Sequence, residues 1–244
     1  MSHSLLLIAA LGLPFVGAVV AGMLPIHARN VAAWLGGGIA VVGVILAILA
    51  LPIISSGEVA RHEISWMPTL GLNLVLRLDG FAWLFLALIY AIGALVMLYA
   101  RYYMSPEDPV PRFFSFLLAF MGSMVGVVLS GNLLQLVFFW ELTSLLSFLL
   151  IGYWHHTAAA RDGARIALTV TATGGLLLFA GVLLLGRIVG SYDLDVVLAS
   201  GDLIRDHALY LPALILILLG TLTKSAQFPF HFWLPHAMAA PTPV

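Results

Sequence analysis

The sequence predicts an all-α polytopic membrane protein with about seven transmembrane helices. Of its 244 residues, 62% are hydrophobic and only 9% are charged, whereas soluble domains carry about 25% charged residues. The mean hydropathy is +1.11, and long apolar runs without charges recur along the whole chain. Since about 20 apolar residues cross the hydrocarbon core as a helix, these runs indicate a chain that crosses the bilayer repeatedly.

The first apolar run is a membrane helix and not a signal peptide, because Met1–Ser4 contains no Lys or Arg and the run exceeds the roughly 7–15 residues of a signal-peptide core. The fourth and fifth runs are separated only by Ser130-Gly131-Asn132, a tight turn that predicts an antiparallel hairpin of helices. The predicted spans are Leu5–Leu24, Val31–Ile54, Phe81–Ala100, Phe113–Leu129, Leu133–Gly152, Ile166–Val189 and Leu209–Phe228.

The chain divides into two parts at the level of sequence. Residues 1–112 carry the first three predicted helices, and residues 113–244 carry helices four to seven. The interval Ser55–Gly80 is too short for a soluble domain. The last residues, Ala240–Val244, are typical of the approach to an eighth helix, since proline favours the first helical turn. We therefore expect the chain to be a fragment of a longer protein.

Arginines in the loops predict the orientation. The loops after helices one, three and five hold five arginines and three acidic residues. The loops after helices two, four and six hold seven acidic residues and four arginines, counting Arg187 at the end of helix six. Positively charged loops stay on the cytoplasmic side. This places the N-terminus outside.

Several functional classes are excluded or disfavoured. The chain has no cysteine and a net charge of −1 without a basic cluster, which excludes disulfides and gives no support to nucleic-acid binding. Gly36–Gly38 lies in an apolar run and not after a strand, so it is not a phosphate loop. His155 and His156 lack further ligands at metal-binding spacing. No cofactor and no metal site is expected.

Two charged residues stand well inside predicted membrane helices, away from their ends: Glu141, in the fifth, and Lys224, the only lysine, in the seventh. A charge near the bilayer centre costs on the order of 3 kcal/mol and indicates function by default. Both helices run in the same direction, with Glu141 about 12 Å and Lys224 about 22 Å along its own helix at 1.5 Å per residue. The long lysine side chain and imprecise helix boundaries permit a pair. A structural ion pair that only fixes helix packing is the alternative.

A lysine–glutamate pair suits a proton relay. An amine that loses solvent releases its proton more readily, and a nearby carboxylate restores the charged form, whereas arginine stays charged. Polar neighbours support this interpretation: Ser144 on the helix of Glu141, and Thr223 and Gln227 beside Lys224. A helix break at Pro229 is expected to leave backbone carbonyls free near the cation, as in the broken helices of transporters.

Two histidines follow Lys224 beyond the expected break, His231 and His236. Imidazole titrates near neutral pH, so either could carry a proton from Lys224 to the next site. A histidine at the membrane interface, bonded to a loop carbonyl, is the alternative interpretation. His231 is the stronger candidate for the relay.

The surroundings of these charges resemble the antiporter-like subunits shared by respiratory complex I and Mrp cation/proton antiporters. The resemblance rests on Phe139-Trp-Glu-Leu-Thr-Ser144, Lys224-Ser-Ala-Gln-Phe-Pro-Phe-His-Phe-Trp-Leu-Pro235 and Pro241-Thr-Pro-Val244. Arg77-Leu-Asp-Gly80 and the residue sequence of Gln227–Pro235 make the chain most similar to the A subunits of Mrp (Pha-type) antiporters.

This resemblance implies two inverted five-helix repeats, the first beginning at helix four, and a broken seventh helix. It implies that Glu141 and Lys224 form the modulating pair of the first repeat, within a multisubunit antiporter that exchanges Na⁺ or K⁺ for protons across a bacterial cytoplasmic membrane. His236 departs from the Asp or Asn of many relatives, and the chain stops before the helix that carries the next relay residues.

Two other functions remain open on the sequence. The relay is shared with the proton-pumping membrane subunits of NADH:quinone oxidoreductases and membrane hydrogenases, so the same residues fit a redox-driven complex. The third interpretation is an inert membrane scaffold in which Glu141 and Lys224 form a packing bridge. In each case the chain has no catalytic chemistry of its own.

Overall fold

The computed structural model describes residues 3–67, 69, 71–105 and 107–242. It consists mainly of helices, and within the described residues six of them are long and apolar enough to cross a membrane. The chain is thus an all-α polytopic membrane protein, as predicted. Two compact units are present: the first unit comprises residues 1–62, 76–129 and 240–244, and the second unit residues 63–75 and 130–239. The sequence division at residue 112 stays a prediction.

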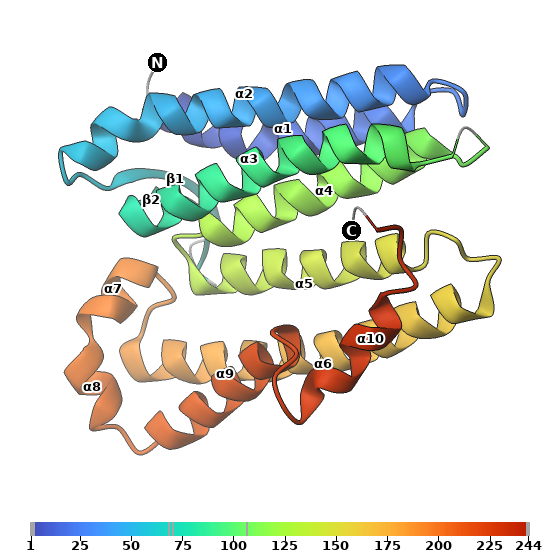
Figure 1. Cartoon of the computed structure of the whole chain (residues 1–244). Coiled ribbons are helices and arrows are strands. Elements are labelled where there is room, and N and C mark those ends of the chain that lie inside the picture. Colours follow the sequence, from blue (N-terminus) through green and yellow to red (C-terminus); the bar gives the residue numbers. More distant parts are fainter. Residues whose placement is uncertain (1–2, 68, 70, 106, 243–244) are drawn as a thin grey trace. The chain divides into compact units, whose positions relative to one another are not determined.

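The first unit contains four of the long helices: α1 (His3–Gly22), α2 (Arg29–Ser55), α3 (Gly80–Tyr103) and α4 (Val110–Val128). Helix α1 packs on α4, and α2 packs on α3 (Figure 1). Tyr90 of α3 is fully buried, and its hydroxyl donates a hydrogen bond to the carbonyl of Ala10 on α1. The indole of Trp83 donates to the carbonyl of Ala47 on α2 over 2.7 Å. Helix α3 is therefore bonded to two neighbours.

Helix α3 begins at a charged cap. The carboxylate of Asp79 accepts a hydrogen bond from the amide of Ala82 at 2.8 Å and forms an ion pair with Arg77 at 2.5 Å. Burial raises the pKa of Asp79, but the Ala82 amide and the Arg77 guanidinium outweigh it, so the pKa lies below its usual value. Negative charge at a helix N-terminus also complements the helix dipole.

A β-hairpin connects α2 to α3, formed by β1 (Ala60–Met67) and β2 (Leu72–Leu78). No strand is predicted here from the sequence. The pattern of β2 nevertheless carries a signal for it, because Leu72, Leu74, Leu76 and Leu78 alternate with other residues, and a period of two is typical of a strand.

The second unit contains α5 (Leu133–Ile151), α6 (Ala158–Val189) and α9 (Tyr210–Lys224), with two short helices between the last two, α7 (Leu194–Ala199) and α8 (Gly201–Arg205). A 3₁₀ turn (Phe230–Phe232) and α10 (Trp233–Ala237) follow. Helix α6 packs against α5, α9 and α10, and Figure 1 shows α9 and α10 side by side with it. Helix α6 is thus the central element of this unit.

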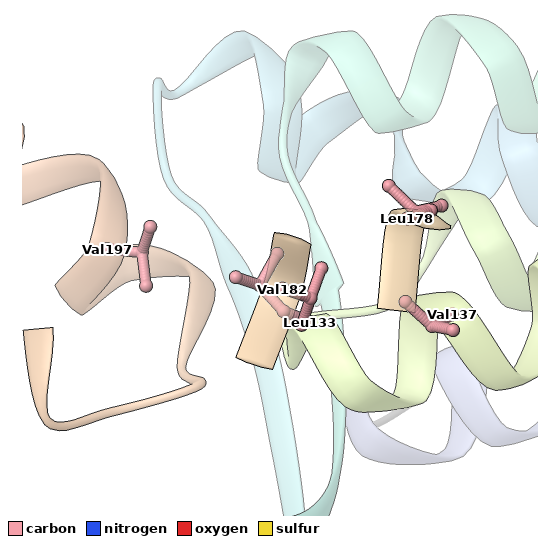
Figure 2. Packing of buried hydrophobic residues seen from close by; sticks show 5 residues of the cluster. All are labelled: Leu133, Val137, Leu178, Val182 and Val197. Atoms are coloured by element: carbon pink, nitrogen blue, oxygen red, sulfur yellow. The ribbon is translucent and has the colours of Figure 1, made fainter. Parts of the chain in front are cut away.

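A cluster of buried apolar side chains joins three helices of the second unit. Figure 2 shows its members, Leu133 and Val137 on α5, Leu178 and Val182 on α6, and Val197 on α7. Partly buried residues, among them Trp140 and Ile217, pack around them. Their burial fixes the rotation of α5 against α6, which decides where the polar residues of α5 point.

The predicted helices correspond to α1–α6 and α9, with two clear differences at the ends. Helix α6 begins at Ala158 and not at Ile166, because the hydroxyl of Thr157 accepts a hydrogen bond from the Ala160 amide and caps its first turn. Helix α9 ends at Lys224 and not at Phe228, for a reason described below with the site.

Asn132 joins α5 to the rest of the second unit and is 4% exposed. Its side-chain oxygen accepts from the amide of Leu134 at 2.9 Å and caps α5, while its amide nitrogen donates to the carbonyl of Gly71 at 2.8 Å. Next to it, Gly131 donates its amide to the carbonyl of Val75. The short turn predicted from the sequence is therefore also the point where the hairpin is attached.

Replacing Asn132 separates these two roles. Asn132→Ala removes the cap and leaves the Gly71 carbonyl without its donor, so we expect a loss of about 1–2 kcal/mol for the cap alone and more in total. Asn132→Ser keeps a capping oxygen and loses only the bond to Gly71, so it should lose less. Apparent melting temperatures in detergent give the order; equal values for both variants and the unchanged protein would contradict it.

Candidate functional site

Lys224 is the last residue of α9, and its ammonium group contacts α5. The Nζ atom donates to Thr143 Oγ1 at 2.8 Å, to Ser144 Oγ at 2.6 Å and to the carbonyl of Trp140 at 3.3 Å. It also lies 5.6 Å from the centre of the Trp140 ring, within cation–π range. We call the three acceptor oxygens the α5 oxygen cluster. A neutral cluster thus holds the only lysine of the chain.

The α5 oxygen cluster follows from helix geometry. Residues three and four positions apart share a face of a helix, so Thr143 and Ser144 lie over the carbonyl of Trp140. The Thr143 hydroxyl donates to that carbonyl at 2.6 Å, and the Ser144 hydroxyl does so at 3.4 Å. Because their protons point to the backbone, their lone pairs are free to accept from Lys224. Both side chains are buried, which strengthens these bonds.

The carboxyl group of Glu141 lies on the same helix but outside this cluster. Its Oε1 atom is buried and has no hydrogen-bond partner in the part of the chain that the structure describes. Its carboxyl group lies where a side chain on Gly175 of α6 would project. The charges of Glu141 and Lys224 are close enough to interact, but among the described residues no ion pair within 4.0 Å joins them. The two groups thus lie near one another without a direct ion pair, and their role as a modulating pair stays a prediction.

Packing on α6 removes the difference in depth that the sequence suggested. A side chain on Gly175 would overlap Glu141, and one on Gly174 would overlap Thr223, the neighbour of Lys224. Glu141 and Thr223 therefore meet adjacent positions of α6, which differ by about 1.5 Å along the helix axis.

Helix α9 ends through a Schellman motif and not through proline. The amide of Gln227 donates to the carbonyl of Leu222 at 3.0 Å, and that of Ala226 to the carbonyl of Thr223 at 3.3 Å. Ala226 has a φ of +50°, the left-handed conformation that this motif requires. Glycine normally occupies this position, so the sequence did not reveal the end of the helix.

Three of the carbonyls that we expected to be free near Lys224, those of Thr221, Leu222 and Thr223, are in fact bonded. The indole of Trp233, beyond the break, donates to the carbonyl of Thr223 at 3.0 Å. The amide and hydroxyl of Ser225 donate to the carbonyl of Thr221. These donors leave little acceptor capacity in the last turn, so Lys224 takes its oxygen partners from α5.

The other predicted residues lie apart from this contact. His231 is exposed and stacks on Phe228 with ring centres 5.8 Å apart, and in the described structure it makes no hydrogen bond or ion pair with Lys224 or Glu141. His236 is also exposed, as is Gln227. Pro229 follows a cis peptide bond. Of the supporting residues, Ser144 accepts a hydrogen bond from Lys224 and Thr223 lies against Gly174 of α6. The functional roles of these residues and of the two histidines stay predictions. Pro243 and Val244 lie outside the described residues.

Three features near Lys224 and Glu141 were not predicted from the sequence: Thr143, the Trp140 carbonyl and the glycines of α6. Thr143 carries a usable signal, because it stands inside an apolar run beside Ser144. Consecutive glycines at 174 and 175 inside a membrane helix are a second signal, since small residues let helices approach closely.

Comparison with known families places the same residues in a wider context. Residues 130–244 match the family model described as NADH:quinone oxidoreductase/Mrp antiporter, TM. Residues 66–114 match the model described as NADH-Ubiquinone oxidoreductase (complex I), chain 5 N-terminus. The first match contains Glu141, Lys224 and both candidate histidines.

Individual relatives are similar over nearly the whole chain. The A/B subunit of a probable K(+)/H(+) antiporter of Rhizobium meliloti is 65% identical over 95% of this chain and 23% of its own length. The A subunit of a Na(+)/H(+) antiporter of Alkalihalophilus pseudofirmus is 45% identical over 95% of this chain and 29% of its own length. The Mrp complex of Dietzia sp. contains a chain with a TM-score of 0.84 and 32% identity, over 97% of this chain and 25% of that one. The chain thus spans about a quarter of the length of these relatives.

Ala226 offers a test of the Schellman motif. Ala226→Gly removes a β-carbon from the left-handed conformation and should stabilise the protein by about 0.5–1 kcal/mol. Ala226→Val places a β-branched side chain there and should destabilise it. Thermal unfolding in detergent measures both, and a stabilising valine would contradict the assigned conformation.

The α5 oxygen cluster predicts the reactivity of Lys224. Hydrogen bonds to a charged group contribute about 1.5–3 kcal/mol, so Ser144→Ala should raise the population of free amine about tenfold or more. Acetylation of Lys224, followed by mass spectrometry, reports this directly because no other lysine lies within these 244 residues.

Ser147→Ala is the matched control for Ser144→Ala, since Ser147 lies one turn further along α5 and makes no hydrogen bond to Lys224. Its labelling rate should equal that of the unchanged protein. Equal rates for Ser144→Ala and the control would show that the hydroxyl does not hold the amine.

Proposed function

The chain belongs to the membrane family shared by NADH:quinone oxidoreductases and Mrp antiporters, and we propose that it is a proton-translocating part of a multisubunit monovalent cation/proton antiporter. The relatives named as antiporter A subunits and the Mrp complex support this assignment. The exchanged cation is Na⁺ or K⁺, and the partners are other Mrp subunits in the cytoplasmic membrane of a bacterium. The N-terminus lies outside, and residues from 113 onward form part of the first of two inverted repeats.

One observation carries the proposal: Lys224 is held by neutral oxygens while a carboxylate lies nearby without direct contact. Three acceptors stabilise the ammonium form. When the proton leaves, the hydroxyls of Thr143 and Ser144 can rotate and donate to the amine, since a hydroxyl both donates and accepts. The α5 oxygen cluster therefore accommodates both protonation states of the lysine, as a relay group requires.

Glu141 supplies the modulation in this scheme. A buried carboxylate oxygen without a hydrogen-bond partner raises the free energy of the protein. That free energy falls when Glu141 takes up a proton or approaches Lys224. Approach favours the charged lysine, and withdrawal favours release of its proton. His231, beyond the end of α9, is the acceptor that we propose next in the relay, with His236 as a further candidate.

Substitution of the two charges tests the relay in the complete antiporter. Glu141→Gln and Lys224→Ala should reduce cation-dependent proton exchange in everted vesicles at least tenfold, with assembly retained. Lys224→Arg is the decisive variant, because arginine keeps the positive charge but does not release a proton. It should also be inactive. Near-normal exchange by Lys224→Arg would favour the scaffold interpretation, in which only the charge matters.

The redox-driven alternative has a separate test, because the family model covers both kinds of complex. Affinity purification of the intact assembly should recover small hydrophobic antiporter subunits. Recovery of flavin- and iron–sulfur-containing subunits in fixed ratio would assign the chain to an oxidoreductase instead.

A further inference from the structure

Helix α6 carries two consecutive buried glycines at the level of the site, Gly174 and Gly175. A β-carbon added at Gly175 would overlap the Glu141 carboxyl group, whose three heavy atoms Oε1, Cδ and Oε2 are the nearest neighbours of that position. One added at Gly174 would overlap the Thr223 side chain. Each glycine therefore leaves room for a specific side chain of a neighbouring helix.

Close helix packing alone does not account for Gly175. At Gly220 of α9, a β-carbon would lie 2.7 Å from the backbone oxygen of Gly174 and 2.7 Å from the β-carbon of Leu178, so that glycine lets two helices approach. At Gly175 the nearest atoms belong to the end of a flexible charged side chain. A methyl group there can be accommodated by rotating Glu141, with the helices left in place.

We propose that Gly175 is a positioning residue for Glu141. By lacking a side chain it lets the carboxyl group lie against α6, beyond ion-pair distance of Lys224, and so leaves the ammonium on the α5 oxygen cluster. Gly174 receives Thr223 one position away, which places the residue next to Lys224 at the same height. The inference rests on the proposed function, since it concerns the residue that modulates the relay.

The test is a double-substitution cycle in the complete antiporter. Gly175→Ala moves the carboxyl group and should lower exchange about tenfold to a hundredfold, as small displacements of reacting groups do. Glu141→Asp, one methylene shorter, should also lower exchange. The double variant should be several-fold more active than the product of the two single effects predicts, because the shorter side chain fits beside the added methyl group. Independent effects that simply multiply would overturn the proposal.

Gly37→Ala is the matched control, because nothing lies within 4 Å of a β-carbon at that position of α2. Its exchange rate should equal that of the unchanged protein. Should Gly175→Ala fail to assemble, Glu141→Ala combined with Gly175→Ala removes the overlapping side chain and should restore assembly. Continued failure to assemble would show that the glycine is needed for helix packing, and would overturn the proposal.

A readout independent of exchange separates this inference from the proposed function. Modification of Glu141 by a hydrophobic carbodiimide, followed by mass spectrometry, reports the position of its carboxyl group. Gly175→Ala should change the labelling rate several-fold, and Gly37→Ala should not. An unchanged rate, with Glu141→Gln inactive, overturns the positioning role alone. A changed rate, with Lys224→Arg and Glu141→Gln fully active, supports the positioning role and overturns the relay.

Discussion

The second unit depends on one requirement: a lysine at the end of an apolar helix needs oxygen partners that water no longer supplies. Helix α9 provides none of them, and donors beyond its end occupy the carbonyls of Thr221, Leu222 and Thr223 in its last turn. Helix α5 provides all three. The rotation of α5 therefore matters, and it is fixed by the Asn132 cap at one end and by the apolar cluster around Leu133 along its length.

Helix α6 packs against both α5 and α9 and allows Lys224 of α9 to reach the oxygens of α5. Gly175 leaves room for the Glu141 side chain of α5, and Gly174 leaves room for the Thr223 side chain of α9, so that these two side chains reach neighbouring positions on α6. Glycine in a helix interior costs about 1 kcal/mol relative to alanine, and several occur in α6. The contacts that each permits explain why this cost is offset. The positions of Glu141 and Thr223 along the helix axes are therefore set by their contacts with α6 and not by the lengths of the connecting loops.

The separation of Glu141 from Lys224 has a functional consequence under the proposed relay. A direct buried ion pair would hold both charges in one state, since breaking it is strongly unfavourable. A lysine bonded to neutral hydroxyls, with the carboxylate at a distance, releases its proton more readily than a lysine in a direct ion pair. Small movements of the glutamate side chain then shift the balance, which is how a modulating residue would act.

The sequence by itself determined the membrane class, the positions of the long helices and the two intramembrane charges, because these depend on hydrophobicity that is local in the chain. The alternating leucines of β2 and the paired glycines of α6 were also visible in it, although their meaning was not. Only the tertiary structure decided where α9 ends, because alanine at residue 226 gives no sign of a left-handed cap. It alone also decided which atoms hold Lys224, since those contacts depend on the rotation and height of three packed helices, and neither quantity is encoded in any single segment.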